Sequence, residues 1–483
     1  MVFNSLIFLA FLAIVLPVYY RLNHRAQNWF LLFASYFFYG WWDPRFLGLL
    51  WFTSFFDYFC AQWLEATKSE VRRKWLLGGS MAVNLAVLGI FKYYNFFADS
   101  AVKLLTTLGF HASLPALQVI LPVGISFYTF LSMSYTIDVY RRELKASHRP
   151  VDFQLFVCYF PHLVAGPIVR ASFLLPQCQK PRVLKADQVV NGIWLVALGF
   201  FKKMVIGDRL AQVAEWGFAS SSPPLADLNS WLIIYAFAFQ IYADFAGYTD
   251  IARGLSKIMG FELVENFRAP YLVTNPSAFW RNWHISLSTW VRDYLYIPLG
   301  GSRLGNARTY ANLMLTMLLG GLWHGAGAAF VLWGLYHGTL LAVHRFWTQL
   351  RDTSDAAPRP AATPTGWLAR LKWAVGVVFF FHLTCFGWLL FRAGSLPPKV
   401  NQVDTVLNYL RAMFTPLQRG WDNILWGVLV LGAIGLFLQW KHDLMERFSE
   451  WPSGWKAAAL VLAGLGIASL GIFEGAQFIY FQF

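Results

Sequence analysis

The chain has 483 residues, of which 57% are hydrophobic and only 13% are charged, whereas an average soluble domain is about 25% charged. Apolar runs recur along its whole length, and no polar stretch is long enough to form a soluble domain. The composition therefore predicts an integral membrane protein. The formal net charge of +14 lies in short clusters beside the apolar runs, which is typical of membrane topology and argues against a nucleic-acid partner.

The apolar runs predict helices, and several approach the roughly 17 to 25 residues that cross a hydrocarbon core about 30 Å thick. In chain order they are Ser5–Tyr20, Trp29–Trp42, Arg45–Leu64, Trp75–Phe97, Leu114–Tyr140, Phe153–Ile168, Val189–Gly207, Trp231–Ile251, Ala311–Trp323, Phe330–Trp347, Trp373–Phe391, Ile424–Trp440 and Trp455–Phe473. The first run lacks a basic segment before it and a cleavage site after it, so we expect a retained helix and not a signal peptide. The pattern predicts an all-α polytopic membrane protein.

Basic clusters between the first runs indicate the topology. They are Arg21/Arg25, Lys68/Arg72/Arg73/Lys74 and Arg141/Arg142/Lys145/Arg149. All of them would face the cytoplasm if the first five runs each crossed the membrane once. This arrangement places the N-terminus outside.

Proline and glycine interrupt two regions of the chain. Pro161 and Pro167 lie within one run, and glycines surround His324 at positions 320, 321, 325, 327 and 334. A membrane tolerates broken or re-entrant helices only where protein or a water-filled cavity satisfies the freed backbone groups. We therefore expect a cavity at membrane depth. The stretch from Asp352 to Gly366, rich in Pro, Ala and Thr, is the clearest flexible linker.

Trp323-His324-Gly325 is the most informative motif, because an ionisable side chain at membrane depth is costly unless it has a function. His324 is the first candidate for chemistry. The alternative is a structural histidine whose ring bonds a backbone carbonyl freed by the neighbouring glycines. A structural role is expected for the other histidines in or beside apolar runs, which are His162, His337, His344 and His382.

Between Gly260 and Arg308 polar residues intermix with aromatic ones. Trp280, Trp283, Leu287 and Trp290 recur at i, i+3, i+7 and i+10, which predicts an interfacial helix with an aromatic stripe. The sequence from Pro298 to Gly301 should end that helix. Charged residues close to the membrane are expected to pair with one another, namely Asp244, Asp250, Arg253, Arg281, Arg292 and Asp293. The widely separated cysteines 60, 158, 178 and 385 are expected to be packing residues.

Several motifs, in order along the chain, resemble the membrane-bound O-acyltransferase family, and most closely its bacterial branch typified by the alginate O-acetylation membrane protein. They are Tyr242–Gly254, Phe279–Ser288, Asp293–Gly301 and Gly320–Gly325, joined by Pro122–Phe130 and Phe160–Ile168. The resemblance implies one domain over 1–483, with its catalytic motifs within 240–340. It also implies a ring of about 11–12 transmembrane helices, with re-entrant and interfacial helices, around a central funnel.

What the resemblance implies for the site is acyl transfer to a hydroxyl. His324 takes the catalytic role and His284 is the second family histidine. Neutral imidazole, with an ordinary pKa near 6.5, suits a base that removes the hydroxyl proton at neutral pH. The candidates for substrate positioning are Trp323, Trp283, Asn282, Asp244 and Arg281. No metal is expected, because the two histidines lie far apart in the sequence with neither an H-E-x-x-H motif nor a cysteine nearby.

The last residues resemble a C-terminal aromatic motif of this branch, in which a tyrosine is proposed to carry the acyl group. Tyr480 is the corresponding residue. The ten residues 474–483 could extend up to roughly 33 to 36 Å, far enough to reach a buried histidine. The alternative is an aromatic anchor at the membrane interface.

The function that the resemblance implies is transfer of acetyl groups from a cytoplasmic donor, acetyl-CoA or another acetyl thioester, across the bacterial inner membrane to an exported polysaccharide such as alginate. No bound cofactor is expected. The resemblance also implies a separate periplasmic SGNH-type transferase that completes the attachment, and the chain itself has no G-x-S-x-G nucleophile motif. The other expected partners are the polysaccharide and membrane lipids. Alternatives are another polymer (cellulose, peptidoglycan or teichoic acid), a long-chain lipid acyltransferase, or a transporter without chemistry.

Overall fold

The computed structural model describes residues 1–110, 113–117, 120–164, 166–219, 230–351, 366–396, 400–413, 423–473, 475 and 478–479. Within these ranges every regular element is a helix, which confirms the predicted all-α fold. Internal contacts divide the chain into two compact units, residues 1–196 with 251–264 (unit 1) and residues 197–250 with 265–483 (unit 2). The prediction of a single domain is not tested by this division.

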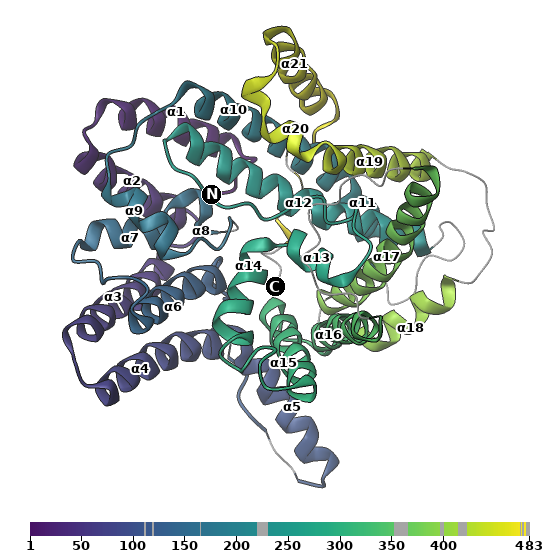
Figure 1. Cartoon of the computed structure of the whole chain (residues 1–483), viewed down its shortest axis with the longest axis horizontal. Helices are drawn as coiled ribbons and strands as arrows, with labels where there is room; N and C mark the ends of the chain where they lie inside the picture. Colours follow the sequence, from purple (N-terminus) through teal and green to yellow (C-terminus); the bar gives the residue numbers. More distant parts are fainter. Residues whose placement is uncertain are drawn as a thin grey trace. The chain divides into compact units, whose positions relative to one another are not determined.

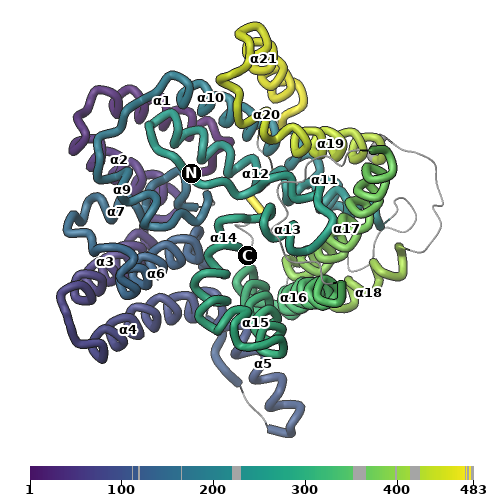
Figure 2. Tube along the Cα trace, viewed as in Figure 1, coloured from purple at the N-terminus to yellow at the C-terminus, as the bar shows by residue number. Residues whose placement is uncertain are grey.

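Unit 1 contains the N-terminal helices (Figure 2). They are α1 (Leu6–Arg21), α2 (His24–Gly40), α3 (Arg45–Ala66), α4 (Glu70–Leu88), the π-helix η1 (Gly89–Tyr93), α5 (Tyr94–Thr107), α6 (Ile125–Arg141), α7 (Pro150–Cys158), α8 (Phe160–Leu163), α9 (Ala171–Gln179) and most of α10 (Ala186–Phe200). The predicted break in the run Phe153–Ile168 is present, because α7 ends before Tyr159 and α8 begins at Phe160. The run Leu114–Tyr140 forms a helix only from Ile125.

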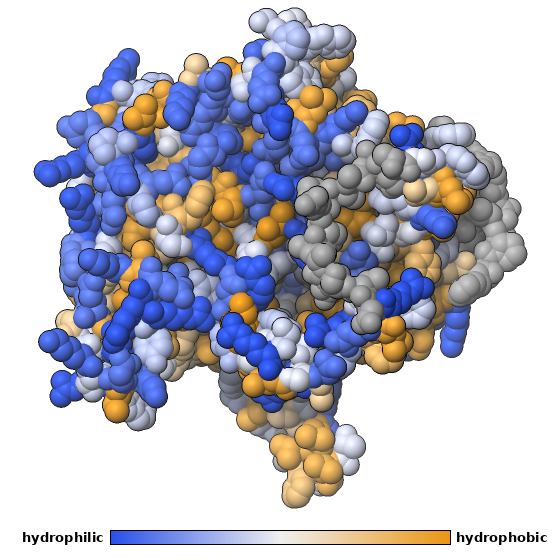
Figure 3. Space-filling view, viewed as in Figure 1, coloured by the Kyte–Doolittle hydropathy of each residue, from blue (hydrophilic) through white to orange (hydrophobic). Residues whose placement is uncertain are grey.

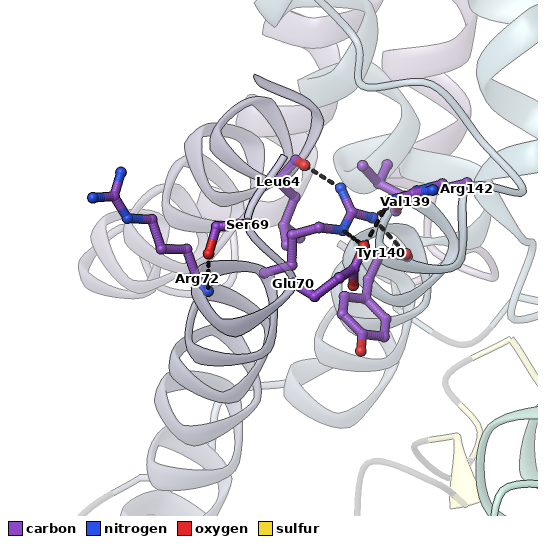
Figure 4. A network of polar contacts seen from close by, with 8 residues as sticks. Leu64, Ser69, Glu70, Arg72, Val139, Tyr140 and Arg142 are labelled. Carbon is purple, nitrogen blue, oxygen red and sulfur yellow. Dashed lines mark hydrogen bonds and ion pairs between the residues drawn. The ribbon is translucent and has the colours of Figure 1, made fainter. Parts of the chain in front are cut away.

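A buried arginine ties three of these helices together. The Arg73 guanidinium, on the first turn of α4, donates to the carbonyl of Leu64 at the end of α3 and to those of Tyr140 (2.6 Å) and Val139 (3.3 Å) at the end of α6. Figure 4 shows these carbonyl groups close to α4. Orphan carbonyls at helix ends need such donors when they are buried. Arg73 therefore stabilises the fold. The other residues of its basic cluster, Lys68, Arg72 and Lys74, are exposed.

Unit 2 contains Phe279–Ser288, Asp293–Gly301 and Gly320–Gly325 and most of Tyr242–Gly254, whereas Pro122–Phe130 and Phe160–Ile168 belong to unit 1. Figure 1 labels its helices. Its helices are the π-helix η2 (Phe201–Gly207), α11 (Asp208–Gly217), most of α12 (Ser230–Ile258), α13 (Pro276–Asn282), α14 (Ile285–Val291), the π-helix η3 (Arg292–Tyr296), α15 (Asn306–His324), α16 (Ala328–Leu350), α17 (Trp367–Gly394), α18 (Gln402–Ala412), α19 (Asn423–Trp440), α20 (His442–Glu446), the 3₁₀ helix η4 (Phe448–Glu450) and α21 (Ser453–Leu470).

The glycines before His324 bring α15 against α16 without breaking α15, which runs unbroken from Asn306 to His324 (Figure 1). A Cβ atom on Gly321 would lie 2.3 Å from the Phe330 carbonyl oxygen, and one on Gly334 would lie 2.4 Å from that of Met317. Only glycine allows backbones to approach so closely. The expected break lies after His324, where Gly325 separates the two helices.

The prediction of one interfacial helix over Trp280–Trp290 is wrong. Instead α13 ends at Asn282, α14 begins at Ile285, and the backbone between them turns through a left-handed residue, His284. The stripe is also buried, since Trp283 is 1% and Trp290 7% exposed. This segment packs inside unit 2, where aromatic side chains surround it.

Length and composition make four of the described helical segments long and apolar enough to cross a membrane, namely 70–107, 186–217, 367–394 and 453–470. Leu6–Arg21 and Leu425–Trp440 are shorter apolar helices. Figure 3 shows apolar side chains over the end of α5, where Phe97 and Leu104 are exposed. Exposed apolar helix faces agree with a polytopic membrane protein, and the count of about 11–12 spans and the funnel stay predictions.

Candidate active site

His324 is the last residue of α15 and is 4% exposed. Aromatic rings surround its imidazole, whose centroid lies 5.1 Å from those of Trp333 and Phe391, in edge-on geometry. Phe391 belongs to α17, so three helices contribute to the site. Because the chain leaves the helix directly after His324, the break at Gly325 places this side chain at a helix end, inside the protein.

His284 lies at the turn between α13 and α14 with φ 43°, in the left-handed region, and is fully buried. A left-handed histidine is uncommon and persists only where its surroundings stabilise it. Asn266 does so, because its backbone carbonyl accepts from Ile285 N–H at 2.9 Å and its Oδ1 accepts from Ser286 Oγ at 2.6 Å and Ser286 N–H at 3.2 Å. His284 lies outside the candidate membrane spans, and burial lowers its pKa to about 3. Its ring is therefore neutral at neutral pH.

Trp323 connects the two predicted histidines. Its ring centroid lies 4.8 Å from that of His324 and 6.1 Å from that of His284, edge-on in both cases. On its other side, His284 meets Phe245 of α12 at 4.6 Å. The structure thus brings together residues that are widely separated in the sequence, and it places two imidazoles in one aromatic, water-poor region. Such a setting favours the neutral ring that a general base requires.

The remaining predicted positioning residues lie in different surroundings. Trp283 stacks on Phe279 at 5.6 Å and meets Trp388 at 4.6 Å, contacts that suit packing. Asn282 donates to the Ala278 carbonyl at 2.7 Å. Arg281 is exposed. Their roles toward a substrate stay predictions.

Asp244 belongs to a buried charged cluster with Lys203 and Asp208, two residues absent from the prediction. Lys203 Nζ lies 2.5 Å from Asp244 Oδ1 and 2.8 Å from Asp208 Oδ1. The neighbouring Lys202 pairs with Asp250 at 2.6 Å. Adjacent lysines inside the apolar run 189–207 are the signal that could have found this cluster. The predicted pairing of Arg292 with Asp293 is confirmed at 2.6 Å.

Ile479, near the C-terminus, contacts the same cluster. The backbone N–H of Ile479 donates to Asp244 Oδ2 at 2.8 Å, and Figure 1 shows this last yellow piece of the chain beside α12. The Phe478 ring lies 5.7 Å from Phe245, the residue that contacts His284. Tyr480, the predicted acyl carrier, lies outside the described residues.

The other histidines have contacts that fit the structural roles predicted for them. His162 Nε2 lies 3.0 Å from the Phe156 carbonyl oxygen, and His382 Nε2 lies 2.7 Å from Tyr235 Oη. His337 packs between aromatic rings, with Trp333 at 4.8 Å. Within the described ranges, one group has ligand atoms spaced closely enough to hold a metal ion, namely Glu265, His442 and Glu446. This group includes neither predicted catalytic histidine.

Replacing Asn266 with Ala should lower activity more than it lowers the amount of folded protein. The change removes the side-chain bonds that stabilise the turn at His284 and leaves a buried N–H of Ser286 without its acceptor, at a cost of about 1–3 kcal/mol. We expect activity to fall about tenfold, measured per membrane-inserted molecule. Ser286→Ala is the matched control, because it keeps the backbone bond and should cost less. Equal activity in the two variants would contradict this role for Asn266.

Comparison with known proteins agrees with this geometry. The sequence model of the membrane-bound O-acyltransferase family matches residues 36–387. The chain is 44% identical to the probable alginate O-acetylase AlgI of Pseudomonas putida, over 100% of both chains. It is 42% identical to the probable alginate O-acetylase AlgI of Pseudomonas aeruginosa, over 92% of this chain and 84% of that protein. It is also 35% identical to the peptidoglycan O-acetyltransferase of Helicobacter pylori, over 82% of this chain and 78% of that protein.

Proposed function

Because the chain belongs to the membrane-bound O-acyltransferase family, we propose that this membrane O-acyltransferase moves acetyl groups from a cytoplasmic thioester, acetyl-CoA, toward an exported polysaccharide, alginate. Relatives named as probable alginate O-acetylases align with most of the chain or all of it, which supports alginate as the acceptor. The more distant relative named for peptidoglycan makes that polymer the next candidate. Family membership favours an enzyme over the transporter without chemistry.

The observation that carries the proposal is the arrangement of His284, Trp323 and His324. Both imidazoles contact one indole in a buried aromatic region, and Phe245 continues this row of rings from His284 to the C-terminal segment at Phe478. A base and a carrier that acted on one acyl group would have to lie near each other. The packing of Phe478 supports Tyr480, two residues further along the chain, as that carrier.

The proposed chemistry has two steps. In the first, the phenol oxygen of Tyr480 attacks the thioester carbonyl while the imidazole of His324 accepts the phenol proton. The carbon–sulfur bond then breaks, and the thiolate takes the proton from the His324 imidazolium and leaves as free thiol, so that an acetyl ester remains on Tyr480. A phenol of ordinary pKa near 10 needs such a base at neutral pH. His284, neutral and next to Trp323, positions the donor or the carrier.

In the second step a hydroxyl oxygen attacks the ester carbonyl on Tyr480 and gives up its proton. The bond between the acetyl carbon and the phenol oxygen breaks, and Tyr480 takes up a proton and is again a free phenol. We assign this step to a periplasmic partner of the SGNH type, because the chain has no G-x-S-x-G motif of its own. The proposal places the protein in the bacterial inner membrane, with the donor inside and the acceptor outside. The family match and the apolar helices support a membrane location of this kind.

Mass spectrometry of the C-terminal peptide tests the carrier. After incubation of the full-length protein with deuterated acetyl-CoA and without a partner, we expect one labelled acetyl group on Tyr480. Tyr480→Phe should remove the label and abolish export of acetyl groups, because the phenol oxygen is the proposed nucleophile. An unmodified Tyr480 in both the presence and the absence of the partner would contradict the carrier role.

A further inference from the structure

Lys203, Asp208 and Asp244 form a buried cluster whose charges ion pairing alone does not explain. All three side chains are at most 5% exposed. Charges inside a membrane protein are expensive, and a buried ion pair often adds no net stability compared with apolar packing. Among the residues that the structure describes, the cluster pairs one cation with two carboxylates. A further partner is therefore expected beside the carboxylates.

The C-terminal segment touches both carboxylates. Ile479 N–H donates to Asp244 Oδ2 at 2.8 Å, on the opposite oxygen from the one that Lys203 binds. The backbone at Gly475 lies against Asp208 so closely that a Cβ atom on this glycine would be 2.4 Å from Asp208 Oδ2. Two contacts four residues apart therefore hold the segment along the cluster.

The local helix geometry explains why Lys203 can serve both carboxylates. Lys203 lies in the π-helix η2, whose backbone bonds join residues five apart, and the Asp208 N–H bonds the Lys203 carbonyl. This turn stacks the side chains of Lys203 and Asp208, which meet at 2.8 Å. Asp244 of α12 completes the bridge from the neighbouring helix. Gly207 allows the approach, since its Cβ would lie 3.2 Å from the Asp244 nitrogen.

Aromatic packing fixes the side chain next to the bonded amide. The Phe478 ring lies 4.7 Å from Tyr248 and 5.7 Å from Phe245. Both rings belong to α12, and Phe245 is in contact with His284. The segment is thus bound by its backbone on one side and by its phenylalanine on the other.

We propose that Lys203, Asp208 and Asp244 form an anchor for the C-terminal segment and position Tyr480, the residue after Ile479, for acyl transfer at the histidine site. The inference rests on the proposed function, since it gives the carrier tyrosine a defined attachment. The three residues act through the segment and do not contact the acyl group, so they are positioning residues. The anchor keeps the carrier close to the base and raises its effective concentration there.

Variants of the segment test the anchor without disturbing the buried charges. Lys203→Met would leave two carboxylates without their cation inside the protein and could prevent folding. Ile479→Pro removes the N–H that Asp244 accepts and also fixes the backbone φ at this position, and Gly475→Ala introduces a Cβ against Asp208. Ile479→Val keeps the N–H and the β-branched shape, so it should retain the attachment that Ile479→Pro loses. Phe473→Ala, at an exposed position outside the anchor, is the control.

Two measurements on the full-length protein separate the anchor from the carrier role. Hydrogen exchange of the C-terminal peptide reports attachment, and deuterated acetyl label on Tyr480 reports transfer. In Ile479→Pro and Gly475→Ala we expect the remaining amides of the peptide to exchange about tenfold faster, and the labelling rate to fall about tenfold, as for loss of a hydrogen bond to a charged group. Ile479→Val and Phe473→Ala should stay within about threefold of the unaltered protein.

Exchange and labelling at unaltered rates in both Ile479→Pro and Gly475→Ala would overturn the anchor. Faster exchange with unaltered labelling would overturn its positioning role. If Tyr480 of the unaltered protein carries no label while exchange responds as expected, the carrier role fails and the anchor itself is supported. The two proposals are thus distinguishable in one set of samples.

Discussion

Replacing His324 with Gln should lower acetylation of the exported polysaccharide by about 10²- to 10⁴-fold, the range that a positioned general base contributes. Glutamine has a similar volume and can form hydrogen bonds, so it fits among Trp333 and Phe391. It has no basic nitrogen that could accept the proton of the attacking hydroxyl. The measurement is the acetyl content of polymer from cells that lack their own enzyme and express the variant.

The comparison requires equal amounts of folded protein. His324→Ala should be equally inactive but less stable, because it opens a cavity beside the aromatic rings. His148→Ala serves as the control, since this histidine is 72% exposed in its side chain and lies on the surface beside Glu65. Polymer acetylation near the unaltered value in His324→Gln, with normal protein levels, would remove His324 as the base.

Replacing Gly321 with Ala should destabilise the protein, whereas Gly320→Ala, one residue earlier on the same helix, should not. A Cβ at position 321 meets the Phe330 carbonyl at 2.3 Å, and nothing lies within 4 Å of a Cβ at position 320. Forcing a methyl group into packed backbone costs about 1–3 kcal/mol. At position 320 the change to alanine instead favours the helix by up to about 1 kcal/mol.

Thermal unfolding of the two purified variants in the same detergent tests this prediction. We expect a lower midpoint for Gly321→Ala and an unchanged or higher one for Gly320→Ala. Activity should also fall in Gly321→Ala, because displacement of α15 moves His324, the last residue of that helix. The same midpoint for both variants would show that α15 and α16 are not packed as closely as described.

Much of the helical framework could be predicted, because apolar runs and helix breakers act locally. The break near Pro161 and the helices around 45–66 and 367–394 follow the hydropathy pattern closely. The family was also predictable, since its motifs are contiguous in the sequence. The glycines near His324 were ambiguous, because the same residue either breaks a helix or lets two helices touch. Only the position of the partner helix distinguishes these roles.

The turn at His284 could not be predicted from its own sequence. No glycine or asparagine marks a left-handed position there, and the conformation depends on bonds from Asn266 to Ile285 and Ser286. The charged cluster is a different case. Lys203 lies inside a predicted apolar run, where its charge is as costly as that of Asp244. The sequence could therefore have identified Lys203 in the same way.

The π-helix at 201–207 makes this region sensitive to the deletion of a single residue. Each residue of an α-helix turns the chain by about 100°, and a π-turn accommodates one residue more than an α-turn does. Deleting a single residue here would convert the segment to regular α-helix and rotate everything before it relative to everything after it. Lys203 and Asp208 would then face different directions. The register of this one turn thus couples the direction of a candidate membrane span to the contacts that Asp208 and Asp244 make with Gly475 and Ile479.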